Sequence, residues 1–159
     1  MPAKYFIAVL MALPLAAADP EGFALWKPAE LQRHERELSK TLRPDHSSRE
    51  TLADYKNHRL RLLYRAAEGY PEQHDNEVDV VIVQSGEGVL QVGGKLVRPE
   101  VNPEANNGVG EWKGAGLEGG ERRNVAAGDI VHIPAGVPHT FLIPKGKHLT
   151  YVLLKLPAR

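Results

Sequence analysis

Apolar and polar residues alternate along the chain from His58 onward, which is the pattern of a half-buried β-strand. Leu60, Leu62 and Tyr64 alternate there with arginines. Residues 78–83 form an almost continuous β-branched run, which predicts a more deeply buried strand. Glycine- and proline-rich turns separate further apolar segments, so strands are also expected at residues 89–92, 124–131, 140–143 and 148–156. Short strands at this spacing predict an all-β sandwich or barrel.

The segment before these strands has a helical pattern instead. Pro28 suits a first helical turn, and the leucines that follow it fall near one helix face. Ser47 and Glu50 have the spacing of a capping box, which predicts a second short helix. We therefore expect a helical N-terminal extension over residues 19–57 and a β-domain over residues 58–159.

A long irregular stretch interrupts the strand pattern at residues 99–120. It is rich in glycine, asparagine and glutamate and contains one aromatic residue, Trp112. These features predict a long loop or an irregular hairpin. Trp112 would either close over the β-domain as a lid or anchor the loop to it.

The first residues have the features of a secretory signal peptide. Lys4 gives a positive start, residues 5–15 are nearly all apolar, and Ala16–Ala18 are the small residues that a signal peptidase needs. About 14 apolar residues rise roughly 21 Å as a helix, which is short of a hydrocarbon core about 30 Å thick. We expect cleavage near Ala18, export to the periplasm or the medium, and no membrane span in the mature form.

Composition and charge exclude several classes of function. The chain has 159 residues, which is enough for one ordinary domain. Lys and Arg total 20, as do Asp and Glu, so no net field attracts a polyanion and nucleic-acid binding is not expected. The chain has no cysteine, which excludes disulfides, thiolate metal sites and cysteine nucleophiles. Any metal must be held by histidine, aspartate or glutamate.

Four residues have spacings that suit a metal site. Glu72 and His74 are two apart, so on an extended chain they point to one face. Asp79 lies in the buried run, and His139 follows a glycine- and proline-rich turn that can direct one side chain inward. Two imidazoles and two carboxylates match a divalent cation such as Mn, Fe or Ni. From spacing alone, unrelated polar surface residues remain an equal alternative.

Two motifs resemble those of the cupin superfamily. Residues 128–139 have glycine, five residues, proline, one residue, glycine, two residues and histidine, as in the second cupin motif. The first cupin motif resembles the segment of Glu72, His74, Asp79 and Gly86, with its spacing intact. Glu72 stands in place of the first histidine of that motif, and Asp79 in place of its glutamate. The resemblance extends over residues 60–151.

The resemblance implies a jelly-roll cupin barrel behind a short helical extension. It also implies a divalent metal ion (Mn, Fe, Ni or Zn) in the barrel mouth, held by Glu72, His74, Asp79 and His139. Glu72 would act as a ligand, as the catalytic acid or base, or only as a neutralising charge. Gln84, Thr140 and Tyr151 are candidates for hydrogen bonds to the ligands.

Three functions fit these features. The first is a metal-dependent enzyme of isomerase, dioxygenase or lyase type that acts on a small oxygenated molecule. The second is a non-catalytic exported protein that binds a small molecule or a metal. The third is an oligomerisation module, since cupins commonly pair as homodimers and the N-terminal extension could contact a second copy.

Overall fold

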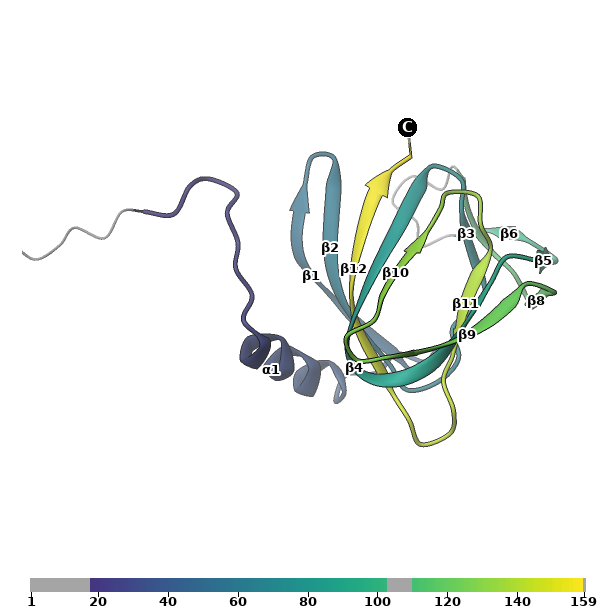
Figure 1. The fold of residues 1–159 in the computed structure, drawn as a ribbon, viewed down its shortest axis with the longest axis horizontal. Coiled ribbons are helices and arrows are strands. Elements are labelled where there is room, and N and C mark those ends of the chain that lie inside the picture. Colours follow the sequence, from purple (N-terminus) through teal and green to yellow (C-terminus); the bar gives the residue numbers. More distant parts are fainter. Residues whose placement is uncertain (1–17, 103–109, 159) are drawn as a thin grey trace, which may run out of the picture.

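A computed structural model describes residues 18–102 and 110–158 of the chain. The expected signal peptide, residues 1–18, lies almost entirely outside the described residues. Within the described part, one helix precedes strands that curl into a barrel (Figure 1). No helix among these residues is long and apolar enough to cross a membrane. The elements are α1 (Pro28–Leu38), β1 (Ser47–Tyr55), β2 (His58–Arg65), β3 (Glu72–His74), β4 (Glu77–Val92), β5 (Lys95–Val97), β6 (Glu100–Val101), β7 (Glu111–Lys113), β8 (Gly116–Glu118), β9 (Glu121–Ala126), β10 (Ile130–Ile133), β11 (His139–Leu142) and β12 (Leu149–Pro157).

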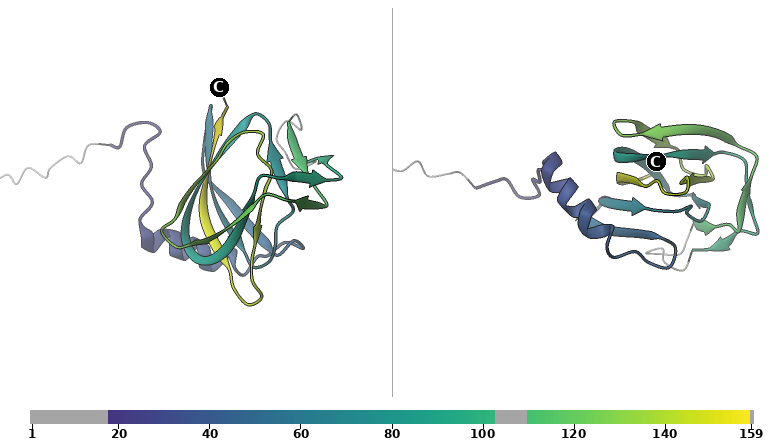
Figure 2. Two further views of the ribbon diagram at one scale, coloured as in Figure 1. Left: turned by 45° about the vertical axis from the view of Figure 1, so that its right-hand side comes forward. Right: turned by 90° about the horizontal axis from the view of Figure 1, so that it is seen from below.

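The helix expected near Pro28 is confirmed. Helix α1 begins there and lies outside the barrel, beside β1 and β2 (Figure 2). Leu38 packs in one buried cluster with Leu62 and Val152, so the helix covers apolar side chains that would otherwise face water. Ser85 adds a polar contact, since its hydroxyl donates a 2.5 Å hydrogen bond to Glu35 on the helix.

The expected second helix is wrong, because residues 47–55 form strand β1. This strand pairs antiparallel with β2 in a hairpin, from Ser47 opposite Arg65 to Tyr55 opposite His58. Asp45 accepts hydrogen bonds from the backbone N–H and the hydroxyl of Ser47. The cap-like serine is thus used at the start of a strand, and sheet pairing overrides the local helical pattern. The sheet therefore begins at Ser47 rather than near residue 58.

The long strand β4 joins the two halves of the barrel. Its first part pairs with β12 and β10, and its last part pairs with β9 and β11. Strands β1, β2 and β12 extend the first half, and β3, β7 and β6 extend the second. Strands β5 and β8 form a separate two-stranded ribbon. This antiparallel barrel confirms the predicted all-β jelly-roll fold class.

Gly86 lies where β4 passes from one half to the other. Its φ is +76°, and a Cβ added there would lie 2.0 Å from the carbonyl oxygen of His148. Only glycine fits both the conformation and the close approach. The glycine of the first motif thus has a structural role in bending β4.

The two faces of the sheet bury different apolar sets. One face carries the main core, which includes Leu63, Val81, Tyr151 and Leu153 inside the barrel. The other face carries the cluster under α1, with Leu60, Leu62 and Tyr64 of β2. The alternating apolar residues of β2 therefore face outward, toward α1. The arginines between them lie on the face that lines the inside of the barrel.

The stretch at residues 99–120 is more regular than a long loop. Residues 103–109 lie outside the described part, but β6, β7 and β8 fall within the stretch. Strand β7 pairs with β3, and the indole of Trp112 donates a 2.7 Å hydrogen bond to Asp75. Trp112 is thus an anchor and not a lid.

Candidate metal centre

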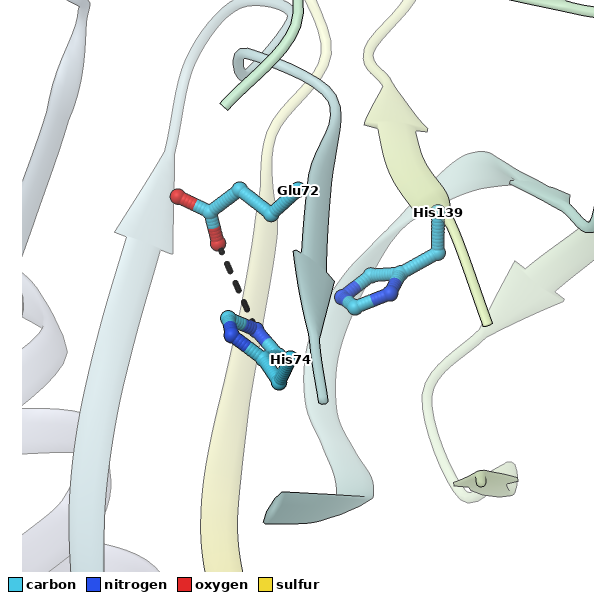
Figure 3. A group of neighbouring side chains, drawn as sticks. All are labelled: Glu72, His74 and His139. Atoms are coloured by element: carbon cyan, nitrogen blue, oxygen red, sulfur yellow. Dashed lines mark ion pairs between the residues drawn. The ribbon is translucent and has the colours of Figure 1, made fainter. Parts of the chain in front are cut away.

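Strands β3 and β11 bring the two motifs together. Glu72 on β3 is the register partner of His139 on β11. The backbone N–H of Gly136, in the turn before β11, donates a 2.8 Å hydrogen bond to the carbonyl of His74. Figure 3 shows Glu72, His74 and His139 converging from these strands. The spacing of two between Glu72 and His74 places both on one face, as predicted.

The four predicted residues lie close together. One ligand atom each from Glu72, His74 and His139 falls within 4.8 Å of the others. The Oδ2 atom of Asp79, on β4, is 3.4 Å from Nε2 of His74 and 3.6 Å from Nε2 of His139. An Oε2 atom of Glu72 is 3.8 Å from Nε2 of His74. The structure therefore assembles the four side chains, while their role as metal ligands stays a prediction.

Hydrogen bonds at the far side of each imidazole set its orientation. Nδ1 of His74 contacts the carboxylate of Glu111 on β7. Nδ1 of His139 lies 3.0 Å from the backbone carbonyl of Val137. Because both partners are acceptors, each Nδ1 carries the proton in a neutral ring and each Nε2 carries a lone pair. Both Nε2 atoms face the Asp79 carboxylate, and a ring whose Nδ1 is held by an acceptor while Nε2 points at a carboxylate cluster is typical of metal-binding histidines.

Nε2 of His74 is a buried polar atom with no hydrogen-bond partner. The side chain is only 5% exposed, so water does not compensate. Leaving such an atom unsatisfied costs free energy, on the order of 1–3 kcal/mol. A cation bound between the imidazoles and carboxylates would satisfy it, so these residues fit a metal ion.

Lys155 is a member of the site that the sequence did not identify. It lies on β12 as the register partner of Asp79, and its Nζ is 3.0 Å from Oδ1 of Asp79 and 3.0 Å from Oε2 of Glu77. The ammonium thus holds one oxygen of Asp79 and leaves Oδ2 facing the imidazoles. Its only sequence signal was a single charge within the apolar run of the last strand.

The charges of this cluster shift the pKa values of its members. Burial raises the pKa of Asp79, but the nearby imidazoles of His139 and His74 and the charge of Lys155 outweigh burial and hold it well below the ordinary value. Burial lowers the pKa of His74, but Asp79 and Glu111 outweigh burial and raise it to about 9. Burial likewise lowers the pKa of Lys155, whereas Asp79 and Glu77 raise it above its usual value. Ionised forms are therefore stabilised by their neighbours.

Three expected supporting residues bond elsewhere. Thr140 donates to the carbonyl of Gly69, and Gln84 donates to the carbonyl of Ile82. The hydroxyl of Tyr151 accepts a 2.9 Å hydrogen bond from Nε of Arg65. Glu111 and Lys155 contact the predicted ligands instead.

Two cavities border the cluster. A small inner space of about 30 Å³ touches Glu72, Asp79 and His139. A wider cavity of about 790 Å³ reaches Glu72 and His74 from the barrel mouth. Together they give a small molecule access to the candidate metal centre.

The fold and the two assembled motifs define a small cupin-type barrel. A cupin-2 domain from Rhodospirillum rubrum has a similar structure, with a TM-score of 0.51 and 19% identity, and the match covers 72% of this chain and 62% of that chain. The chain thus spans less than two thirds of that relative.

Two further solved structures resemble the chain over more of its length. A protein from Bacillus halodurans has a TM-score of 0.58 and 17% identity, with 88% of this chain and 84% of that chain covered. A protein from Thermus thermophilus has a TM-score of 0.53 and 16% identity, and the match covers 77% of this chain and 92% of that chain. No family model and no curated protein matches the sequence. The comparisons therefore establish the cupin fold.

Proposed function

We propose that the chain is an exported small cupin in which Glu72, His74, Asp79 and His139 hold a divalent metal ion. The carrying observation is the pair of imidazoles whose Nε2 atoms both face Asp79, one of them buried without a hydrogen bond. Two nitrogen and two carboxylate ligands suit Mn, Fe, Ni or Zn.

The proposed activity is that of a metal-dependent enzyme acting on a small oxygenated molecule. A bound divalent cation would supply Lewis acidity to oxygen atoms of the substrate. Glu72 is the most accessible of the four side chains, 28% exposed against 5–6% for the others. Its carboxylate is therefore the group best placed to take or return a substrate proton at the cavity. Whether the reaction is an isomerisation, an oxygenation or an elimination depends on the substrate.

Metal analysis of the purified protein tests the proposal. The parent should hold about one equivalent of metal, and His74→Ala and His139→Ala should lose it. His132→Ala is the matched control, because His132 on β10 is exposed and outside the cluster. A parent without metal after growth with Mn, Fe, Ni and Zn would overturn the proposal.

Turnover separates catalysis from binding. Diols and aldoses form a first substrate panel, because neighbouring oxygens suit a chelating metal. Glu72→Gln should lower any turnover more than it lowers metal content. If this variant keeps both, the proton-transfer role of Glu72 is wrong.

A non-catalytic small-molecule-binding cupin is the second candidate. The observation that favours it is the ion pair of Asp79 with Lys155, which balances that carboxylate without a metal. This candidate predicts ligand binding by a metal-free protein and no turnover.

Export and a homodimer complete the proposal. The signal-peptide pattern of residues 1–18 supports export, and N-terminal mass spectrometry of the mature protein should find Met1 absent. Phe23 and Leu25, 57% and 64% exposed before α1, could pack on a second copy. Sedimentation of the mature chain and of one that starts at Pro28 tests this role.

A further inference from the structure

Strand β2 directs its arginines into the barrel cavity. Leu60, Leu62 and Tyr64 pack in the cluster beside α1, so the alternate side chains lie on the opposite face. Arg59, Arg61 and Arg65 all line the 790 Å³ cavity. The alternation of β2 therefore makes the inner side of the barrel polar and basic at this strand.

Positive charge predominates along the cavity wall. Eight lysines and arginines line it, against five aspartates and glutamates. The full chain has no net charge, so this excess is local to the cavity. A concave surface with an excess of one charge attracts ligands of the opposite charge. The basic lining residues are Arg43, Arg49, Lys56, Arg59, Arg61, Arg65, Lys113 and Lys155.

Arg61 differs from the neighbouring cations in its contacts. Arg59 forms a 2.8 Å ion pair with Asp54, and Arg65 donates to Tyr151. Arg61 is partly buried, and within the described residues its guanidinium has no hydrogen bond or ion pair. Burial lowers the pKa of Arg61, and the positive charges of Arg59 and Arg49 lower it further, against a weaker opposite effect of the Glu77 and Asp54 carboxylates. A partly desolvated guanidinium beside two others is a place where an anion is stabilised.

The sheet register sets the distance from Arg61 to the metal cluster. Lys155 is paired with Arg59 on one side and with Asp79 on the other, so these three residues share one row. Two interstrand spacings, about 10 Å, separate the backbones of Arg59 and Asp79. Arg61 is two residues farther along β2. Arg61 also lines the same cavity as Glu72 and His74, so one small molecule in this cavity can contact both.

We propose that Arg61, flanked by Arg49 and Arg59, binds the carboxylate of a small, oxygen-rich anion whose other end lies at the metal cluster. A guanidinium binds a carboxylate through two parallel hydrogen bonds, which gives orientation as well as affinity. The inference deepens the proposed function, on which it rests for the second contact. It specifies the substrate class as hydroxy- or keto-carboxylates in place of neutral sugars or diols.

Gluconate and sorbitol test the carboxylate contact in the full mature chain. The two molecules have the same carbon chain and differ in one carboxylate against one alcohol. Calorimetric titration should show gluconate binding at least about tenfold tighter than sorbitol. Equal affinities, or no binding of gluconate, would overturn the inference. Inorganic phosphate is the third probe: if it binds through Arg61 and gluconate does not, the carboxylate class is wrong.

Variants assign the preference to Arg61. Arg61→Gln should reduce it to less than about twofold, and Arg61→Lys, which keeps the charge but not the planar pair of donors, should retain part of it. Arg122→Gln is the control, because Arg122 is exposed on β9 outside the cavity lining and should change nothing. A full preference in Arg61→Gln would contradict the assignment. If Arg61→Gln does not fold, the inference is still tested by two results: the parent's preference for gluconate over sorbitol, and a weaker preference in Arg61→Lys.

Titration with and without a chelator separates this inference from the proposed function. Removal of metal should weaken both ligands but leave the preference for gluconate, because Arg61 is not a metal ligand. A preference that persists in a protein that never holds metal would overturn the proposed function and keep the carboxylate site. A protein that holds metal but shows no preference for gluconate would keep the proposed function and overturn the carboxylate site.

Discussion

Glu72 and His139 lie directly opposite each other on β3 and β11, although they belong to different motifs. The Gly136 N–H reinforces this pairing through its hydrogen bond to the carbonyl of His74. The candidate metal centre is thus built on paired strands rather than on free loops. Rigid backbone of this kind keeps ligand side chains in place before a ligand arrives.

Glu111→Gln should weaken metal binding without removing a ligand. Glu111 contacts Nδ1 of His74 and so keeps Nε2 directed at the cluster. An amide can instead offer its NH₂ to that nitrogen and holds the ring less strongly. We expect metal affinity to fall about 10- to 100-fold, measured by competition with a chelator. Glu118→Gln, at an exposed position of β8, is the control for a lost charge and should have a much smaller effect.

Lys155→Met should destabilise the metal-free protein. It leaves Asp79 buried without the ammonium that neutralises it, and breaking a buried pair costs about 3 kcal/mol. Added metal should recover part of the loss, because a cation can replace the missing charge. Lys147→Met removes an exposed pair with Glu87 and should cost less than about 1 kcal/mol. Urea denaturation of both variants would contradict the account if their losses were equal.

Gly86→Ala should be among the most destabilising substitutions in the barrel. The added Cβ would meet the carbonyl of His148, and the residue would be held at positive φ. We expect a loss of about 3 kcal/mol in the free energy of unfolding. Gly146→Ala is matched in conformation, with φ +78°, but meets no atom within 4 Å and should lose about 1 kcal/mol. Similar losses of stability in the two variants would mean that the contact with the His148 carbonyl does not contribute to the effect of Gly86→Ala.

Asp45 should make the start of β1 sensitive to acid. Burial raises the pKa of Asp45, but hydrogen bonds from Ser47 and the charge of Arg43 outweigh it and lower the pKa below 3.8. A carboxyl with a depressed pKa stabilises the folded state above its unfolded pKa and loses this contribution as the pH falls through the folded pKa. Asp45→Asn should therefore cost on the order of 1 kcal/mol at pH 7 and much less at pH 3. Denaturation at both pH values measures this, and a difference that grows toward acid would contradict it.

The barrel and the assembly of its four central residues could be predicted from the sequence. Alternation identified β2, the apolar run identified the first part of β4, and the glycines and prolines of the second motif located the turn before His139. These signals are local, because they depend on side-chain direction and turn conformation. Strand β1 was missed because Ser47 and Glu50 also fit a helix start, and only pairing with β2 decides between the two.

The partners of the central residues could not be predicted in the same way. Glu111 reaches His74 because β7 pairs with β3, and Lys155 reaches Asp79 because β12 pairs with β4. Each contact depends on the register between strands that are distant in the sequence. The inward direction of Arg61 likewise depends on α1, which covers the apolar face of β2.

Anomalous diffraction from crystals of the purified mature protein tests the central claim most directly, because it identifies an element and its ligands together. The account predicts one strong peak between the two imidazoles, about 2.0–2.3 Å from Nε2 of His74 and Nε2 of His139. Carboxylate oxygens of Asp79 and Glu72 should complete the ligand set. Metal-loaded crystals with no peak there, or with Lys155 alone neutralising Asp79, would contradict it.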